Sequence, residues 1–191
     1  LHPRVRRQRQ MCIRDRLITG DYTTEERILL DVEVIKEDGS KHYLAVNDAV
    51  VARGQLSKTI DLHLTLDGDE ISKYRADGLL FATPTGSTAY SLSAGGPILA
   101  PKMECILMTP VCPHSLFSRS VLFSGESELS VHVKIPEECC CVLTIDGEKN
   151  VPVLATDRVV IRKSDLKLKL ALLHNRNFYK LLNEKLKERD F

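Results

Sequence analysis

Hydrophobic and polar residues alternate along most of the chain, a pattern typical of strands with one buried face. The clearest example is 59–66, where isoleucine and leucine at even positions alternate with threonine, aspartate and histidine at odd positions. Asp-Gly pairs at 38–39, 67–68 and 146–147 predict tight hairpin turns. Similar alternation, or a short apolar run, predicts further strands at 28–35, 41–46, 70–75, 79–82, 128–135, 139–145, 158–162 and 166–172.

The spacing of these signals predicts the fold class. Turns recur at roughly ten-residue intervals, as they do in antiparallel β-sandwiches. Helical signals are confined to two short stretches, 88–94 and 178–187, and strands do not alternate with helices as in parallel α/β folds. The sequence also lacks the glycine-rich loops of P-loop and dinucleotide-binding proteins. We therefore expect a mainly β, sandwich-like fold with a few short helices.

The composition limits the classes of partner. The chain has 191 residues, of which 43% are hydrophobic, and this suffices for one globular core. With 27 basic and 26 acidic residues the net charge is +1, which argues against a strongly basic nucleic-acid-binding protein. Tryptophan is absent, and no apolar run approaches the roughly 20 residues of a membrane span. We expect neither a nucleic acid nor a membrane as partner.

The six cysteines indicate a compartment rather than a site. Three of them are consecutive, at 139–141, and none forms a C-x-x-C pair. This spacing predicts buried free thiols and no metal site. Because reduced thiols are usual in the cytoplasm, we expect a cytoplasmic protein.

The first sixteen residues differ in character from the rest of the chain. They contain six arginines and show no periodic apolar face. We interpret 1–16 as a non-native leader, such as a sequence-assembly join would leave. A basic arm that binds nucleic acid is the alternative.

Residues 75–98 carry the strongest chemical signal. A short apolar strand at 79–82 leads into a turn of small residues at 83–87, in which Gly86 permits a positive φ. Ser87 is suited to cap a helix that begins at Thr88, and the glycines at 95–96 are suited to end it. Such a helix start leaves backbone N–H groups free for a phosphate, a carboxylate or a ribose hydroxyl.

Two side chains of the same stretch suit a ligand with an aromatic ring. Tyr90 falls in the first helical turn, where it can cover a flat ring or, alternatively, pack in the core. Asp77 precedes the strand and can accept a hydrogen bond from an amide or an exocyclic amine.

The literal string at 83–98 closely resembles the nucleotide-binding stretch of NAD kinases, the enzymes that phosphorylate NAD to NADP. Residues 45–50 resemble the family's Asn-Glu segment, with Asp48 where glutamate is more usual. Residues 110–116 resemble its Pro-His-(Thr/Ser)-Leu turn. Asp146-Gly147-Glu148 stands where the family commonly has Asp-Gly-Gln. The resemblance extends from about residue 25 to about residue 175.

The resemblance implies a domain organisation. NAD kinases have an N-terminal α/β domain with a Gly-Gly-Asp-Gly motif, whose aspartate helps to activate the attacking hydroxyl and binds metal. Their C-terminal β-rich domain supplies most contacts to NAD. No Gly-Gly-Asp-Gly occurs in this sequence, so we expect the C-terminal domain alone, with the N-terminal α/β domain absent. The expected parts are a leader at 1–16, the NAD-binding domain at 17–175 and a C-terminal helical extension at 176–191.

The implied reaction is transfer of the γ-phosphate of ATP to the 2′-hydroxyl on the adenosine side of NAD, with Mg²⁺ or another divalent metal as cofactor. The implied partners are NAD, ATP and further copies of the chain in a homo-oligomer. The catalytic aspartate would lie in the missing domain, so we assign no catalytic residue and expect the isolated chain to be inactive.

The resemblance also implies the NAD-binding residues. Asn47 and Asp48 would hold the ribose hydroxyls, and Arg75 would pair with a phosphate or orient Asp77. The remaining residues would hold the base, the nicotinamide end or the helix-end contacts. The full set is Asn47, Asp48, Arg75, Asp77, Thr88, Ala89, Tyr90, Ser91, Leu92, Ser93 and Glu148.

Plainer interpretations stand beside these. Asn47 and Asp48 can form a simple Asx-turn, Arg75 can be a solvated surface charge, and Glu148 can be an ordinary turn residue. For the whole chain, the alternatives are a non-catalytic nucleotide-binding or assembly module and a related diacylglycerol or other lipid kinase domain.

Overall fold

The computed structural model describes residues 3–54, 59–115, 118–134, 141–173 and 177–187. The chain divides into two compact units. The larger is Arg27–Leu168, and the smaller combines Leu1–Glu26 with Lys169–Phe191.

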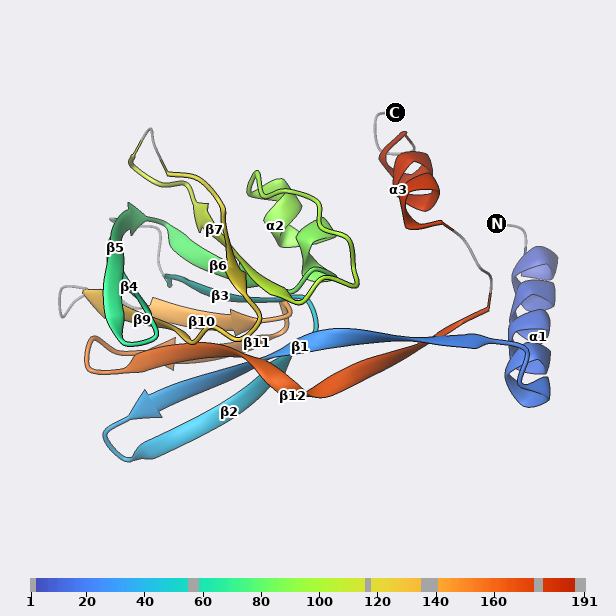
Figure 1. The fold of residues 1–191 in the computed structure, drawn as a ribbon, viewed down its shortest axis with the longest axis horizontal. Coiled ribbons are helices and arrows are strands. Elements are labelled where there is room, and N and C mark those ends of the chain that lie inside the picture. The colour runs from blue at the N-terminus through green and yellow to red at the C-terminus, as the bar shows by residue number, and fades with distance from the viewer. Residues whose placement is uncertain (1–2, 55–58, 116–117, 135–140, 174–176, 188–191) are drawn as a thin grey trace. The chain divides into compact units, whose positions relative to one another are not determined.

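The larger unit is built from two six-stranded sheets (Figure 1). The first contains β1 (Thr23–Lys36), β2 (Gly39–Ala45), β4 (Ile60–Leu66), β5 (Asp69–Ala76), β9 (Leu129–Lys134) and β12 (Arg158–Leu172), in the order β2-β1-β12-β9-β4-β5. The second contains β3 (Asp48–Arg53), β6 (Gly78–Ala82), β7 (Cys105–Val111), β8 (Val121–Ser124), β10 (Cys141–Ile145) and β11 (Lys149–Val153), in the order β11-β10-β3-β6-β7-β8.

The main hydrophobic core lies between the two sheets. Along β4, Ile60, Leu62 and Leu64 are buried and Leu66 is partly buried. The three buried residues join one cluster with Phe81 of β6 and Leu143 of β10. A second cluster, which includes Leu80 and Leu99, lies on the opposite face of β6. Because β6 is buried on both faces, its sequence is a continuous apolar run. The predicted mainly β, sandwich-like fold is confirmed.

The strand predictions are most accurate for strands that have one solvent-exposed face. The predicted strands 158–162 and 166–172 are one continuous strand, β12, and residues 139–140 lie outside the described residues. Strands β3, β7, β8 and β11 were not predicted. β7 is buried at six of its seven positions and carries no alternation, whereas β8 has only four residues.

The predicted helix at 178–187 is confirmed as α3 (Phe178–Lys187). The predicted helix at 88–94 is instead a 3₁₀ turn, η1 (Gly86–Thr88), followed by a four-residue helix, α2 (Tyr90–Ser93). The prediction of buried thiols is correct for Cys105 and Cys141 and wrong for Cys12 and Cys112, which are exposed.

The smaller unit contains α1 (Pro3–Thr19), the outer ends of β1 and β12, and α3. The helix α1 was not predicted, although arginine, glutamine, leucine and methionine all favour helices. It ends at Gly20, whose φ of 74° breaks the helical path. The Arg16 guanidinium donates to the Leu173 carbonyl oxygen at 2.5 Å within this unit. The assignment of 1–16 as a leader stays a prediction.

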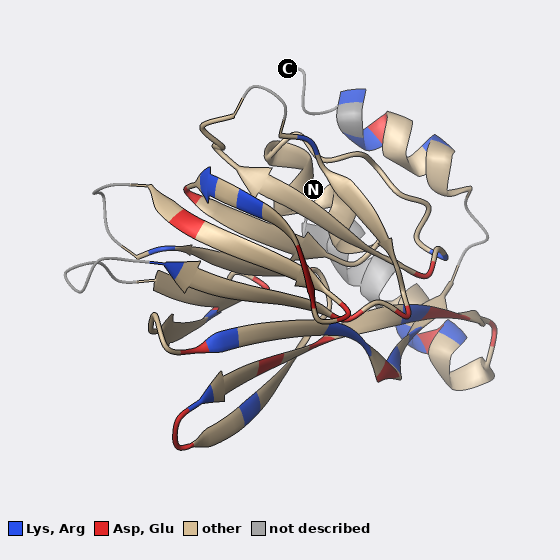
Figure 2. Cartoon of the chain, turned by 60° about the vertical axis from the view of Figure 1, so that its left-hand side comes forward, with Lys and Arg blue, Asp and Glu red and all other residues tan. Residues whose placement is uncertain are grey.

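Basic and acidic residues are interleaved along the strands of the larger unit (Figure 2). Arg162 of β12, for example, contacts Glu33 of β1 at 3.0 Å and Glu128 at 2.7 Å. None of the helices in the described part of the chain is both long and apolar enough to cross a membrane.

Candidate functional site

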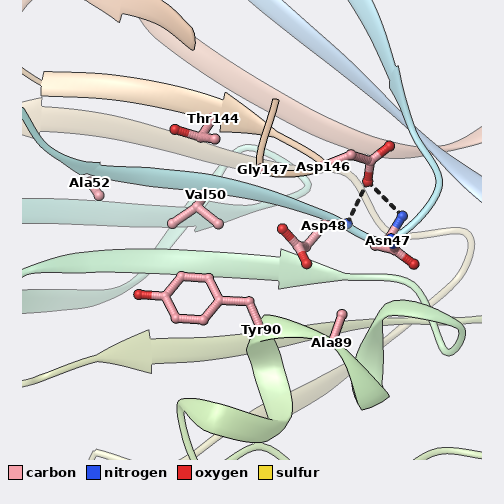
Figure 3. A pocket seen from close by; sticks show the side chains of 9 residues that line it. All are labelled: Asn47, Asp48, Val50, Ala52, Ala89, Tyr90, Thr144, Asp146 and Gly147. Carbon is pink, nitrogen blue, oxygen red and sulfur yellow. Dashed lines mark hydrogen bonds between the residues drawn. The ribbon is translucent and has the colours of Figure 1, made fainter. Parts of the chain in front are cut away.

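A cavity of about 410 Å³ opens on the outer face of the second sheet. Figure 3 shows one wall formed by Thr144 and the β10–β11 turn, and the opposite wall formed by the start of α2. The strand β3 runs between them. The lining residues are Asn47, Asp48, Val50, Ala52, Ala89, Tyr90, Thr144, Asp146 and Gly147.

Strand register brings the β10–β11 turn next to the residues before β3. Ile145 of β10 pairs with Ala49 of β3, so Asp146 lies beside Asp48. The Asp146 carboxylate accepts three backbone N–H groups: that of Val46 at 2.9 Å, that of Asn47 at 2.7 Å and that of Asp48 at 3.1 Å. A carboxylate offers about four lone-pair positions, so one side chain can hold a whole turn of backbone.

The other side of the same turn is held by Thr83. Asp48 of β3 pairs with Ala82 of β6, which places Thr83 opposite Asn47. The Thr83 hydroxyl donates to the Val46 carbonyl oxygen at 2.7 Å, and the Thr83 N–H donates to the Asn47 carbonyl oxygen at 2.9 Å. The segment 46–48 is therefore fixed from both flanking strands.

Gly86 has a different role from the predicted one. It does not have a positive φ, so that prediction is wrong. A Cβ atom at this position would instead lie 1.9 Å from the Asn47 carbonyl oxygen. Glycine is required here because two backbones approach closely, with no room for any side chain.

The predicted capping role of Ser87 is also wrong. Its hydroxyl donates to the Pro84 carbonyl oxygen at 2.7 Å and accepts the Leu99 N–H at 3.0 Å. The N–H groups of Ser87 and Ala89 donate to carbonyl oxygens inside the turn, and that of Gly86 donates to the Thr83 hydroxyl. These three N–H groups are therefore not available to an anion.

The Asp48 carboxylate lines the same cavity but differs from that of Asp146 in its hydrogen bonding. Only 5% of the residue is exposed, and its carboxylate points between the two walls (Figure 3). Among the described residues, no hydrogen bond to this carboxylate is found. Burial, with a smaller repulsion from Asp146, raises the pKa of Asp48 to about 6. Its backbone is held by Asp146 and its neighbours, and no Asx-turn forms through the Asn47 or Asp48 side chain in the described chain.

Asp48→Asn should stabilise the fold at neutral pH. The folded protein holds the Asp48 proton more tightly than the unfolded chain does, because the pKa rises from 3.8 to about 6 on folding. Stability is therefore lost as the pH rises through this window and stays lower above it. An amide has no charge to desolvate, so the variant should gain about 1–3 kcal/mol of unfolding free energy at pH 7.5 and lose this pH dependence.

Asp157→Asn is the matched control for urea unfolding across pH. Asp157 is also buried, but it accepts from Lys36 at 3.1 Å and from the Leu154 N–H at 3.0 Å. The same substitution there removes satisfied contacts and should lower stability. A pH dependence that is unchanged in Asp48→Asn would contradict the assignment of the raised pKa.

Tyr90 lies at the cavity wall and not in the core. It is 46% exposed, so the alternative of a core tyrosine is wrong. Its ring and Ala89 form the wall opposite Thr144 and Asp146 (Figure 3). An exposed ring beside a cavity is suited to cover a planar ligand group.

Arg75 and Asp77 do not line the cavity and do not pair with each other. Arg75 contacts Asp61 through two hydrogen bonds of 2.8 and 3.0 Å, and its side chain is exposed. Asp77 accepts two hydrogen bonds from Arg53, at 2.7 and 3.1 Å. The expectation that Arg75 orients Asp77 is therefore wrong, and Arg53, which the sequence did not single out, holds Asp77.

The other predicted residues surround the cavity without lining it. Ser91 is buried and its hydroxyl lies 3.1 Å from that of Thr109, so it supports the structure. Leu92, Ser93, Thr88 and Glu148 do not belong to the lining set. The ligand roles assigned to these residues, and to Arg75 and Asp77, stay predictions.

Five lining residues were not predicted as site residues: Val50, Ala52, Thr144, Asp146 and Gly147. The Asp-Gly pair at 146–147 was visible as a hairpin turn, but its partner at 46–48 is about a hundred positions away in the sequence. Only the pairing of β10 with β3 brings them together.

Solved structures share this architecture. The crystal structure of yeast NADH kinase complexed with NADH superposes with a TM-score of 0.85 at 27% identity, and the match covers 94% of this chain and 55% of the other. An NAD kinase from Archaeoglobus fulgidus in complex with ATP gives a TM-score of 0.74 at 26% identity, covering 92% and 64%. The fold is that of the C-terminal domains of NAD kinases.

Sequence comparison agrees with the fold. The NAD kinase of Natranaerobius thermophilus is 39% identical over 177 residues, which make up 92% of this chain and 62% of that enzyme. The NAD kinase of Magnetococcus marinus is 40% identical over 173 residues, or 89% and 56% of the two chains. The model of the ATP-NAD kinase C-terminal domain matches residues 46–173. The chain belongs to this family, and it spans less than two thirds of the length of these relatives.

Proposed function

We propose that this chain binds NAD in the cavity between β3 and α2 and is the NAD-binding part of an NAD kinase, which phosphorylates NAD to NADP with ATP. The observation that carries the proposal is the Asp48 carboxylate. The residue is largely buried, its carboxylate opens onto the cavity, and no hydrogen bond to that carboxylate is found in the described chain. A largely desolvated carboxylate is costly, and a ligand diol that donates to it offsets that cost.

The relatives support this choice of ligand. The solved yeast relative is complexed with NADH and the Archaeoglobus relative with ATP, and the curated relatives carry the name NAD kinase. The family assignment favours NAD over the lipid substrates of a diacylglycerol kinase. In this chain, Asn47 and Asp48 would hold ribose hydroxyls, and Tyr90 would cover a ring.

The described residues do not fit a Mg²⁺ site of their own. No group of three or more His, Cys, Asp or Glu side chains is placed to hold a metal ion in the described ranges. Each Asp146 oxygen accepts at least one backbone N–H group, whereas the Asp48 carboxylate accepts none in the described chain. We propose that a divalent metal reaches the full enzyme with ATP.

Three further properties belong to the proposal. The 191-residue chain is expected to bind NAD without transferring phosphate. The reason is that the Gly-Gly-Asp-Gly motif, which the resemblance to NAD kinases links to catalysis, does not occur in it. The functional enzyme is expected to be a homo-oligomer. It is expected to act in the cytoplasm, in line with its free cysteines.

Tyr90→Ala should weaken NAD binding without weakening the fold. The side chain is half-exposed and forms a cavity wall, so truncation removes ligand contact and little core packing. We expect about tenfold lower NAD affinity by calorimetry, and unfolding free energy changed by no more than about 0.5 kcal/mol. Tyr22→Ala is the matched control, because Tyr22 is 41% exposed and does not line the cavity. Equal NAD affinity in both variants would refute the ring-covering role.

A further inference from the structure

We propose that Asp146 is a positioning residue for the ligand: its carboxylate fixes the backbone at 46–48 and so presents the Asn47 and Asp48 side chains to NAD. This inference rests on the proposed function, in that NAD is the ligand whose binding it explains. It assigns to the Asp-Gly turn a role that does not require Asp146 to touch the ligand.

The geometry for this role is specific. One Asp146 oxygen accepts the N–H groups of Asn47 and Asp48 (Figure 3). The other oxygen accepts the N–H group of Val46. The Asp146 N–H donates in return to the Asp48 carbonyl oxygen at 2.9 Å. Four hydrogen bonds thus connect Asp146 to three consecutive residues. A change at Asp146 therefore affects the backbone N–H groups of all three.

Thr83 and Gly86 complete the constraint from the opposite side. Thr83 binds the carbonyl oxygens of Val46 and Asn47, and Gly86 packs against Asn47 with no space for a Cβ atom. The backbone at 46–48 is therefore blocked on the side of Thr83 and Gly86, and it can move only on the side of Asp146. Loss of the Asp146 carboxylate removes the hydrogen bonds that hold it on that side.

The Asp146 carboxylate is held by backbone donors, whereas the Asp48 carboxylate has no donor in the described chain. Burial, with a smaller repulsion from Asp146, raises the pKa of Asp48. The other titratable groups that face Asp48 are few. Tyr90 lines the opposite wall, β6 has no titratable side chain, and β10 has only the buried Cys141.

Asp146→Asn tests the proposal, with Asp67→Asn as a matched control. Asp67 also has a positive φ, 50° against 49° for Asp146, and it also begins an Asp-Gly turn. Its carboxylate accepts one distant backbone N–H, that of Glu128 at 2.9 Å, far from the cavity lining. Asparagine tolerates this backbone conformation, so both variants lose an acceptor without added strain.

We expect Asp146→Asn to bind NAD at least about tenfold more weakly by calorimetry, and Asp67→Asn to bind within about twofold of the unaltered chain. The carboxyl ¹³C titration of Asp48 in the unliganded protein should shift to lower pH in Asp146→Asn only, because the neighbouring negative charge is gone. The Asp48 titration thus reports only the loss of the charge, whereas a role of Asp146 limited to stability would change the melting temperature and leave NAD affinity unchanged.

Hydrogen exchange of the backbone at 46–48 separates this proposal from the proposed function, since it needs no ligand. In the unaltered chain these N–H groups should be protected without NAD, and in folded Asp146→Asn they should lose protection. Rapid exchange in the unaltered chain, or full protection in the variant, overturns the positioning role. Retained NAD affinity in Asp146→Asn also overturns it. If exchange behaves as expected and the unaltered chain does not bind NAD, the positioning of 46–48 stands and the assignment of NAD fails.

Discussion

Gly86→Ala should destabilise the protein by about 3 kcal/mol or more and abolish NAD binding at concentrations that saturate the unaltered chain. The added methyl carbon would lie 1.9 Å from the Asn47 carbonyl oxygen and 2.7 Å from the Asn47 Cα. Both obstructing atoms are backbone, so no side-chain rotation relieves the clash. Asn47 must move, and its movement breaks the hydrogen bond from Thr83 and displaces Asp48.

Gly95→Ala provides the control for this experiment. Gly95 follows α2, and a Cβ atom there meets nothing within 4 Å, although the φ of 87° is unfavourable for alanine. That variant should lose only about 1–2 kcal/mol from backbone strain. Urea unfolding and NAD titration of both variants give the comparison. A Gly86→Ala protein that is as stable as Gly95→Ala would contradict the close approach of the two backbones.

Catalysis by this chain should be much slower than catalysis by a full-length relative. The 191-residue chain should form NADP from NAD and ATP at least about a thousandfold more slowly than a full-length relative, a difference of about 4 kcal/mol in activation free energy. Phosphoryl transfer depends on positioned charges, and the resemblance assigns the activating aspartate to a motif that this sequence does not contain. We assign to the cavity residues contacts with the ligand and no replacement for that group.

The NAD kinase of Natranaerobius thermophilus is a suitable reference enzyme, because it is 39% identical to this chain over the shared region. A coupled assay that detects NADPH should give a clear rate for the reference and none above background for this chain. A rate within tenfold of the reference would refute the proposed division of roles.

The sequence predicted the strands well wherever one face of the strand is exposed to solvent. The alternation of β4 and the Asp-Gly turn that follows it can be recognised without knowing which strands lie beside β4. The buried strand β7 could not be predicted in this way, because a strand covered on both faces has no period of two. Its Pro110 also argues against a strand when only local signals are considered.

The site was predictable in part, and for a physical reason. Asn47, Asp48, Ala89 and Tyr90, which the resemblance singled out, line the cavity. The contribution of Asp146 depends on hydrogen bonds to residues about a hundred positions earlier, which no local pattern reveals. The glycine at 86 was correctly singled out for the wrong reason, since the requirement comes from Asn47 and not from its own backbone angles.

Calorimetric titration of the unaltered chain with NAD, repeated with Asp48→Asn, tests whether this cavity is the NAD site. We expect saturable binding of one NAD per chain, and affinity lowered about tenfold in Asp48→Asn because a charge-assisted hydrogen bond to the ligand is lost. The variant should remain folded, since it removes a buried charge that has no partner in the described chain. A folded, unaltered chain that shows no saturable binding at millimolar NAD, or equal affinity in Asp48→Asn, would contradict the assignment of this cavity as the NAD site.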